Sequence, residues 1–335
     1  MNIYLDNGYL DFEKIINTKC AFIFIIGGRG TGKTFGAIKY AYENNKEFIF
    51  MRRTQTQVEV IARPEYSPFN ALNRVIGSNI ETRKSSRYTG DISVGDKTIG
   101  NILALSTISN LRGFSSNAEI LIYDEFIPEP HEKPIKAEGS AFFNAYETIN
   151  RNRELEGRPP LQCLCLSNSN TLKNPILEEL NLVDILEKKK RKGATEYINQ
   201  NRGIAVFLLD ESEISKKKKE TALYKAVQGS KFFDMAISNT FAEDNPENIK
   251  SQKLDEYAPF INIMGEFVIY KHKSEKRYYI SKHLAGKPAH EFNNNKIDVK
   301  RVRRQFPFLF DKRLRNNIYF ESYQLQIKFD NFLNI

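Results

Sequence analysis

The sequence has few cysteines and no long apolar run. Its three cysteines are Cys20, Cys163 and Cys165. The last two alternate within an expected strand, where we expect that both cannot face one partner, so neither a disulfide framework nor a zinc site is favoured. No apolar stretch of about 18 residues occurs, and no apolar run with a basic flank precedes residue 22. We therefore expect no signal peptide, no membrane contact and a reducing, cytoplasmic location.

Acidic residues are fewer than basic ones. The 335 residues include 50 Lys and Arg against 41 Asp and Glu, a formal net charge of +9. The excess is uneven, because residues 251–335 hold 16 basic and 9 acidic side chains. A basic balance indicates a polyanionic partner, most often nucleic acid. The length allows two domains, or one large domain with an appendage.

A glycine-rich turn lies between an expected strand and an expected helix near the start of the chain. The apolar run Phe22–Ile26 leads into the pattern GxxxxGKT, and Phe35–Tyr42 has helical character. Backbone N–H groups of such a loop bind phosphates, its lysine reaches the β- and γ-phosphates, and its hydroxyl ligates Mg²⁺. The sequence thus predicts a nucleotide site formed by Gly27, Gly28, Arg29, Gly30, Thr31, Gly32, Lys33 and Thr34.

Two adjacent carboxylates end a later apolar run, Ile120–Tyr123. Neighbouring side chains on a strand point to opposite sides, so we expect Asp124 and Glu125 to act separately. Asp124 is predicted to share Mg²⁺ with Thr34, and Glu125 to polarise a water beside the γ-phosphate. A second acid is typical of ATP hydrolysis rather than of a kinase or GTPase switch. The predicted cofactors are ATP and Mg²⁺.

The remaining pattern predicts an α/β fold, a parallel sheet with helices on both faces. The expected core strands are 22–26, 47–51, 101–106, 120–125, 161–166 and 204–209, with a polar β-ribbon over 80–101. The expected helices are 35–42, 65–77, 138–154 and 175–190. We expect an ATPase domain over 1–212, a linker over 213–250 and a basic domain over 251–335. In the last, a β-stretch Phe260–Lys271 precedes a turn and a second stretch, Arg277–Lys282.

Five motifs in order resemble one known family, the genome-packaging ATPases of small tailed phages of the phi-29 type. They are GGRGTGKT, then residues 47–53, 122–127, 151–154 and 163–168. The resemblance is strongest over 20–185. It implies an ASCE-type P-loop domain, a helical linker and a C-terminal domain related to the RNase H-like nuclease of large terminases. It also implies a homo-oligomeric ring, usually a pentamer, at the portal of an empty capsid, with double-stranded DNA as substrate.

The resemblance assigns further roles at matching positions. Asn168 is expected to be a sensor of the nucleotide state. Arg151 is expected to enter the site of the neighbouring subunit as an arginine finger, with Arg153 as the alternative because the spacing leaves a two-residue ambiguity. A trans arginine would stabilise transition-state charge. The competing interpretation of Arg151 is an ordinary basic helix end.

The roles of three other arginines remain open. Arg29 either reaches the γ-phosphate or pairs with a nearby acid. Arg52 and Arg53 follow an expected strand end, where they contact phosphate or a neighbouring subunit, or simply form a surface pair. The lysine-rich runs at 188–192 and 216–219 are interpreted as solvated faces.

The C-terminal region lacks the pattern of a working nuclease, which gathers three or four carboxylates around two metals. Its acids Glu266, Asp298, Asp311 and Glu321 are scattered among basic residues. We expect a domain that kept the fold and lost the chemistry. Its surface, including Arg301, Arg303 and Arg304, is predicted to bind DNA, a structural RNA or the portal.

Three hypotheses of function follow. The first is an ATP-driven motor that moves double-stranded viral DNA into a preformed capsid, located in the host cytoplasm and transiently on the procapsid. The second is a ring helicase or a helicase loader. The third is a nucleotide-gated scaffold that docks DNA on a portal without turnover. Whether a packaging RNA is needed stays open.

Overall fold

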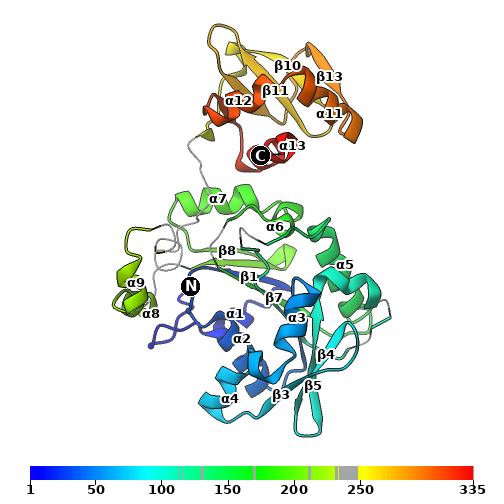
Figure 1. Cartoon of the computed structure of the whole chain (residues 1–335), viewed down its shortest axis with the longest axis vertical. Coiled ribbons are helices and arrows are strands. Elements are labelled where there is room, and N and C mark those ends of the chain that lie inside the picture. The colour runs from blue at the N-terminus through cyan, green and yellow to red at the C-terminus, as the bar shows by residue number, and fades with distance from the viewer. Residues whose placement is uncertain are drawn as a thin grey trace. The chain divides into compact units, whose positions relative to one another are not determined.

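The computed structural model describes residues 1–111, 113–114, 116–129, 132–168, 171–209, 213–230, 233 and 248–334. Part of the predicted linker, 231–232 and 234–247, lies outside them. The chain divides into two compact units, the first of residues 1–180 and 188–243 and the second of residues 181–187 and 244–335 (Figure 1). Within the described ranges, no helix is both long and apolar enough to cross a membrane.

A large mixed sheet forms the centre of the first unit. Among the described residues, nine strands pair in the order β3-β4-β5-β2-β6-β7-β1-β9-β8. The strands from β5 to β9 in this order are parallel, whereas β3, β4 and β8 pair antiparallel at the two edges. The bounds are β1 Phe22–Ile26, β2 Phe48–Arg52, β3 Ile80–Lys84, β4 Thr89–Val94, β5 Lys97–Ala104, β6 Ile120–Asp124, β7 Gln162–Ser167, β8 Glu196–Asn199 and β9 Ile204–Leu208.

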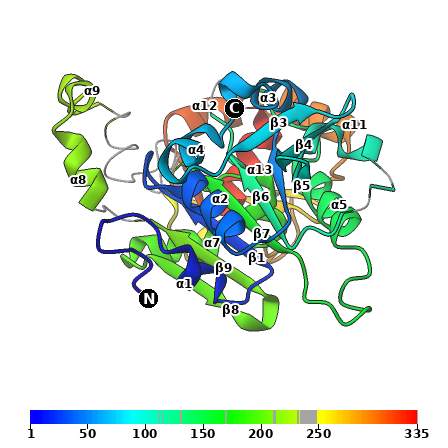
Figure 2. The ribbon, with the colours of Figure 1, turned by 90° about the horizontal axis from the view of Figure 1, so that it is seen from below.

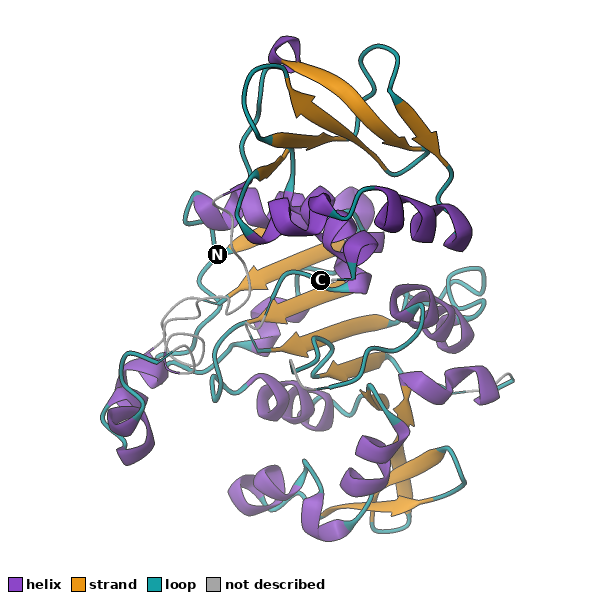
Figure 3. Cartoon of the chain, turned by 45° about the horizontal axis from the view of Figure 1, so that its top comes forward, coloured by secondary structure: helices purple, strands orange, loops and turns teal. Residues whose placement is uncertain are grey.

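Helices cover both faces of this sheet, as predicted (Figure 3). Apolar side chains of α1, α2 and α4 share one core cluster with one face of the strands, and in Figure 2 α1 and α2 lie in front of the strands they cover. On the other face, Phe142 of α5 stacks on Tyr123 with ring centroids 5.7 Å apart. The helices are α1 Phe12–Ile16, α2 Lys33–Glu43, α3 Gln55–Ile61, α4 Asn70–Ile76, α5 Glu138–Asn150, α6 Pro175–Glu179, α7 Val183–Arg191, α8 Glu213–Lys219 and α9 Ala222–Ala226, with 3-10 turns at Pro64–Tyr66, Leu105–Leu111 and Gln200–Arg202.

The strand order determines where the functional side chains meet. β7 lies between β1 and β6 and is parallel to both. This separation of the phosphate-loop strand from the carboxylate strand is the arrangement of the ASCE type. Because parallel strands end at the same edge of a sheet, the turns after β1, β6 and β7 lie side by side. The predicted fold class is confirmed.

Several boundaries differ from the prediction. The ribbon and the third core strand are continuous, because β5 pairs with β4 along one side and with β2 along the other. The helix expected over 138–154 ends at Asn150, since Arg151 has φ 45°. The helix expected over 175–190 is two helices, separated at Asn181, whose φ is 53°. A residue with positive φ interrupts the helix at each of these positions.

The argument from cysteine alternation was wrong. Cys163 and Cys165 are two positions apart on β7, and residues i and i+2 of a strand lie on the same face. Their sulfurs are 3.6 Å apart, in hydrogen-bond contact. All three cysteines are buried and free.

The second unit is an α+β fold. Its strands order as β13-β10-β11-β12-β14, with β10, β11 and β12 antiparallel and the outer two parallel to their neighbours. The expected stretch Phe260–Lys271 is a hairpin, because Gly265 at φ 79° turns the chain between β10 and β11. Apolar residues of α11, α12 and α13 cover one face of the sheet. The bounds are β10 Tyr257–Ile263, β11 Phe267–His272, β12 Tyr278–Ser281, β13 His290–Phe292, β14 Ile318–Phe320, α11 Lys296–Gln305, α12 Phe308–Leu314 and α13 Tyr323–Leu333.

Candidate nucleotide-binding site

The phosphate loop joins β1 to α2. Gly30 and Gly32 have φ of 73° and 83°, a conformation that glycine adopts without strain. Lys33 is the first residue of α2, and its Nζ donates to the carbonyl oxygens of Gly27 at 2.9 Å and Gly28 at 2.7 Å. The loop therefore surrounds the lysine side chain, with the N-terminus of α2 directed at the same place, as phosphate binding requires.

Lys33 is buried, with 8% of its surface exposed. Burial lowers the pKa of its ammonium group to about 7, Asp124 opposes this shift, and the cations of Lys218 and Arg29 reinforce it. A desolvated lysine surrounded by other cations is stabilised in its charged form when an anion binds. The electrostatic environment of the loop therefore favours the binding of a polyphosphate.

Asp124 ends β6 opposite the loop. It is 7% exposed, and its Oδ1 accepts a 2.8 Å hydrogen bond from the Thr34 hydroxyl. Burial raises the pKa of this carboxyl group, whereas Arg52 and the Thr34 hydrogen bond lower it. A hydroxyl and a carboxylate in contact provide the hard oxygen ligands that Mg²⁺ prefers. The predicted metal pair therefore meets in space.

Glu125 departs from strand geometry. It follows the last residue of β6 and has φ 57°, in the left-handed region. The prediction that the two acids point to opposite sides is wrong, because after this turn both carboxylates contact the same nitrogen, Arg52 Nη1. Such conformations in residues other than glycine occur mainly at functional sites.

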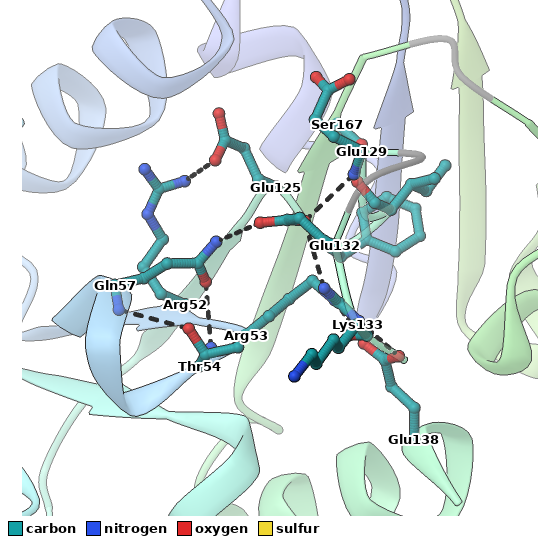
Figure 4. Close-up of polar contacts among 12 residues, drawn as sticks. Arg52, Arg53, Thr54, Gln57, Glu125, Glu129, Glu132, Lys133, Glu138 and Ser167 are labelled. Atoms are coloured by element: carbon teal, nitrogen blue, oxygen red, sulfur yellow. Dashed lines mark hydrogen bonds and ion pairs between the residues drawn. The ribbon is translucent and has the colours of Figure 1, made fainter. Parts of the chain in front are cut away.

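Arg52, at the end of β2, contacts both carboxylates. Its Nη1 lies 3.1 Å from Asp124 Oδ2. The same atom lies 2.5 Å from Glu125 Oε2 (Figure 4). β2 is the neighbour of β6 in the sheet, so the two strand ends bring these side chains together. The roles expected for Arg52 were contact with phosphate, contact with a neighbouring subunit or a surface pair. None of these roles includes the contact that the structure shows, in which Arg52 neutralises the acid pair Asp124 and Glu125.

Arg53 has a different environment, because its side chain is fully buried. Its Nε and Nη2 donate to the two carboxylate oxygens of Glu138, at 2.7 and 3.0 Å, and its Nη1 lies 3.2 Å from Glu132 (Figure 4). Gln57 of α3 also donates to Glu132, at 2.7 Å. This network ties the end of β2 to the segment after β6 and to the start of α5, so Arg53 is structural.

Two cavities adjoin the loop. The first, of about 350 Å³, contains most of the predicted site; its lining residues are Arg29, Gly30, Gly32, Lys33, Thr34, Phe35, Asp124, Glu125, Ser167 and Asn168. Asn168 comes directly after β7, between the two motifs, as a sensor requires. The second, of about 700 Å³, shares Gly30, Gly32 and Phe35 with the first and extends along α2 past Tyr9, Tyr40 and Val75.

Arg29 lies in the first cavity and pairs with an acid. Its Nη2 is 2.5 Å from Glu129 Oε1, and its side chain is 42% exposed. Of the two predicted alternatives, the structure shows the pairing with a nearby acid.

The two finger candidates differ in burial. Arg153 is 5% exposed and donates to the carbonyl oxygens of Ala118 at 2.7 Å and Pro159 at 3.1 Å. Arg151 is exposed, with its guanidinium on the carbonyl oxygens of Thr148 and Phe114. Both follow α5, whose end is fixed to the start of β7 by Asn150, which accepts from Leu161 N at 2.8 Å. Since β7 separates this edge from the loop edge, Arg151 lies roughly 15–20 Å from its own phosphate site, at about 3.3 Å per strand residue.

Comparisons with known proteins agree with this geometry. A profile of the family described as podovirus DNA encapsidation protein (Gp16) matches residues 5–300. The chain belongs to this family. It is 24% identical over 266 residues to the DNA packaging protein of Bacillus phage phi29, covering 78% of this chain and 72% of that one. For the protein of Bacillus phage B103 the identity is 26% over 245 residues, covering 70% and 67%.

Solved structures show the same fold in phage packaging motors. The phi-29 viral genome packaging motor assembly matches with a TM-score of 0.67 at 18% identity, covering 99% of both chains. The Phi-28 gp11 DNA packaging motor matches with a TM-score of 0.64 at 19% identity, covering 96% and 97%. The predicted resemblance is confirmed, and the chain is a phage DNA-packaging protein.

The four acids singled out in the second unit of this packaging protein each have a local partner. Glu266 pairs with Lys328 at 2.8 Å, and Asp311 with Arg315 at 2.8 Å. Asp298 accepts from Asn293 and Asn295 beside the N-terminus of α11, and Glu321 accepts from Ser281. Among the described residues, no group of three or more His, Cys, Asp or Glu side chains could hold a metal.

The predicted basic cluster of this packaging protein lies on α11, and its arginines differ. Arg303 donates to Phe332 O at 2.6 Å and to Asn334 at 3.0 Å, so it ties α11 to the end of α13. Arg301 is exposed and lies 5.9 Å from the ring of Phe292, and Arg304 is also exposed. Only Arg301 and Arg304 are therefore well placed to meet a partner.

Sequence reasoning missed Glu129, Tyr9 and Lys218, and it missed the contact of Arg52 with the two carboxylates. Arg52 and Glu129 each lie close in sequence to a predicted strand end, which is a usable signal. Tyr9 precedes every motif, and nothing in its neighbours marks it. Lys218 belongs to the run interpreted as a solvated face, and this interpretation is wrong for Lys218, whose Nζ donates to Arg29 O at 2.7 Å.

Proposed function

We propose that the protein hydrolyses ATP to move double-stranded phage DNA into a preformed capsid. The observation that carries this proposal is the meeting of Lys33, Thr34 and the two carboxylates in one cavity at the shared edge of β1 and β6. Membership of the DNA encapsidation family supplies the process that the ATPase would drive.

The loop N–H groups and Lys33 bind the phosphates in this mechanism. Thr34 and Asp124 are the residues that would hold Mg²⁺, and the metal when bound neutralises charge on the β- and γ-phosphate oxygens. Arg52 must then release Asp124, because one carboxylate cannot serve both cations at full strength. Glu125 accepts a proton from the attacking water or orients it, and Asn168 contacts the same water or the γ-phosphate from the end of β7.

The second cavity is suited to the base and ribose. It adjoins the loop at Phe35 and Gly32 and is lined by the aromatic rings of Tyr9, Phe35 and Tyr40. Gly32 has no side chain where Tyr9 approaches, since a Cβ there would lie 2.8 Å from the Tyr9 ring. Apolar and aromatic walls with a few polar groups are typical of a nucleotide base site.

Arg151 acts on a neighbouring subunit in this proposal. Its exposure and its position at the sheet edge opposite the loop support a role in trans, and the burial of Arg153 argues against the alternative. A finger supplied by a neighbour requires a ring, and we propose a homo-oligomeric ring, of five subunits as in phi-29-type motors. Double-stranded DNA, the portal and, where one exists, a packaging RNA are the proposed partners, in the host cytoplasm and on the procapsid.

We propose that the second unit binds partner molecules and does not cleave DNA. Its acids are engaged in local ion pairs and caps, which does not suit two-metal hydrolysis. We propose a domain with a vestigial nuclease fold that contacts DNA, RNA or portal through its basic surface. Plasmid DNA incubated with the protein and Mg²⁺ or Mn²⁺ should stay intact.

An ATPase assay with different DNA substrates tests the main proposal. Phosphate release should be stimulated by intact duplex DNA in the presence of procapsids, and much less by single strands. Separation of a forked duplex would instead indicate a helicase or helicase loader. ATP binding without phosphate release under every condition would indicate a docking scaffold, and either result would overturn the motor proposal.

A further inference from the structure

Lys218 contacts the phosphate loop from a distant part of the chain. It belongs to α8, and its Nζ donates to the carbonyl oxygen of Arg29 at 2.7 Å, across 189 residues of sequence. The lysine lies directly against Gly30, where a Cβ would be 1.8 Å from its Nζ. The loop therefore leaves a space at Gly30 that the Lys218 side chain occupies.

Three cations converge on this loop. Lys33 contacts the carbonyls of Gly27 and Gly28, and Lys218 contacts the carbonyl of Arg29, the next residue along. Burial and the neighbouring Arg29 lower the pKa of Lys218, and Lys218 in turn lowers the pKa of Lys33. Like charges in such proximity repel each other, and a bound polyanion would relieve that repulsion.

The helices α8 and α9 position Lys218. Thr221 Oγ1 donates to Lys218 O at 2.9 Å, and the ring of Tyr224, buried in α9, lies 5.9 Å from Lys218 Nζ. An ammonium group has three donors, so the bond to Arg29 leaves further capacity for phosphate oxygens. The other lysines of the run offer a comparison, since Lys217 is exposed to solvent.

We propose that Lys218 is a third cation of the triphosphate site and that it couples α8 and α9 to the presence of the γ-phosphate. This inference rests on the proposed ATP binding and extends it. The lysine of such loops, here Lys33, reaches the β- and γ-phosphates. Lys218 approaches the next carbonyl group of the same loop, that of Arg29. Arg29 and Gly30, the two residues that Lys218 approaches, line the cavity that also contains Lys33, Thr34 and the two carboxylates, so we place Lys218 at the phosphate end of the nucleotide.

Nucleotide affinity tests the proposal. The full chain carrying Lys218→Met is compared with wild type and with Lys217→Met, using the fluorescent methylanthraniloyl forms of AMP-PNP and ADP with Mg²⁺. We expect Lys218→Met to weaken AMP-PNP binding about tenfold, as the loss of one close charge in a partly desolvated site would do. ADP binding should weaken much less, Lys217→Met should resemble wild type, and Lys218→Arg should recover part of the affinity.

The outcomes separate this inference from the proposed function. If wild type binds AMP-PNP and Lys33→Ala does not, while Lys218→Met binds it as wild type does, the Lys218 proposal is wrong and the nucleotide site stands. An equal loss for AMP-PNP and ADP would overturn the assignment to the γ-phosphate. If wild type itself binds neither nucleotide, the proposed function fails. A urea unfolding midpoint equal to that of wild type shows that a loss in Lys218→Met is not caused by unfolding.

Discussion

Asp124 and Glu125 are adjacent in the chain but have different environments. Asp124 is buried at the end of β6 and bonded to Thr34, whereas the Glu125 side chain is 50% exposed and follows a left-handed turn. The left-handed conformation costs about 1 kcal/mol for a residue with a Cβ. This cost is small compared with the benefit for catalysis of a second carboxylate in the cavity, beside that of Asp124. Their substitutions should therefore have different effects.

Lys33→Ala and Glu125→Gln should separate binding from turnover. Without the lysine, the loop loses the charge that its carbonyls hold in place, so ATP affinity should fall by tenfold or more. Glu125→Gln keeps the size of the side chain and should bind ATP as wild type does, with hydrolysis reduced by roughly 10³ or more. Equilibrium binding and phosphate release measure the two effects. Hydrolysis at the wild-type rate in Glu125→Gln would show that Glu125 is not the acid that activates water.

Arg52 should compete with Mg²⁺. Its guanidinium contacts both carboxylates, so the metal must displace it from Asp124. Arg52→Ala should lower the Mn²⁺ concentration needed to half-fill the site in the presence of AMP-PNP several-fold. The Arg52–Asp124 pair is largely buried, with side chains 16% and 9% exposed, and its loss leaves the Asp124 charge to the metal. Spin-resonance titration of free Mn²⁺ measures this without turnover. Lys84→Ala, which breaks the exposed pair with Glu59, serves as the control, and an unchanged midpoint in Arg52→Ala would contradict the competition.

The helix α11 presents its arginines in different ways. Arg303 bonds to the end of α13, while Arg301 and Arg304 are exposed. Replacing an engaged arginine changes packing, whereas replacing an exposed one changes only surface charge. Arg303 is therefore predicted to have a different function from Arg301 and Arg304, although the three form one basic cluster in the sequence.

Replacing Arg301 and Arg304 together by Gln should weaken DNA binding and reduce its salt dependence. Each lost phosphate contact lowers the slope of log K against log salt by about 0.9, so the pair should change it by roughly 2. Arg303→Gln should instead lower the free energy of unfolding in urea, with a smaller change in slope. If the double replacement leaves the slope unchanged, the two arginines do not contact DNA phosphates and make another contact, such as one in a subunit interface.

The protein as a whole is proposed to work as a ring, because its finger and its phosphate site lie at opposite edges of one sheet. Arg151→Ala should bind ATP normally and hydrolyse it about 10³ times more slowly. Mixing it with Glu125→Gln protein should restore part of the activity, since some interfaces then pair an intact Glu125 with an intact Arg151. Phosphate release by the mixture, with subunit exchange confirmed by native mass spectrometry, measures the effect.

A nearby arginine provides the control for this experiment. Arg158 is exposed and pairs with Glu156 in the same segment, so Arg158→Ala removes an equal charge and should hydrolyse ATP as wild type does. A mixture that stays inactive although mixed rings form, together with a fully active Arg151→Lys, would exclude the trans role. Arg29 would then be the remaining arginine of the phosphate cavity to test.

The sequence by itself determined the elements whose signals are local. The strand, phosphate loop and helix over residues 22–43 and the carboxylates after β6 are encoded by adjacent residues, since apolar runs, glycines and acids fix both the backbone and the chemistry there. Asn168, at the end of a predicted strand, was assigned by the family resemblance and not by its position alone. The family was recognisable because five such local motifs keep their order along the chain.

Only the tertiary structure decided the roles that depend on distant contacts. Arg52 and Arg53 are adjacent and chemically identical, yet one meets the carboxylates of β6 and the other is buried against Glu138. Arg151 and Arg153 differ in the same way, and Lys218 leaves a run of surface lysines to reach the phosphate loop. Burial and partners for these side chains are set by strand order and helix packing, which join residues about 30 to 190 positions apart. No window of neighbouring residues contains that information.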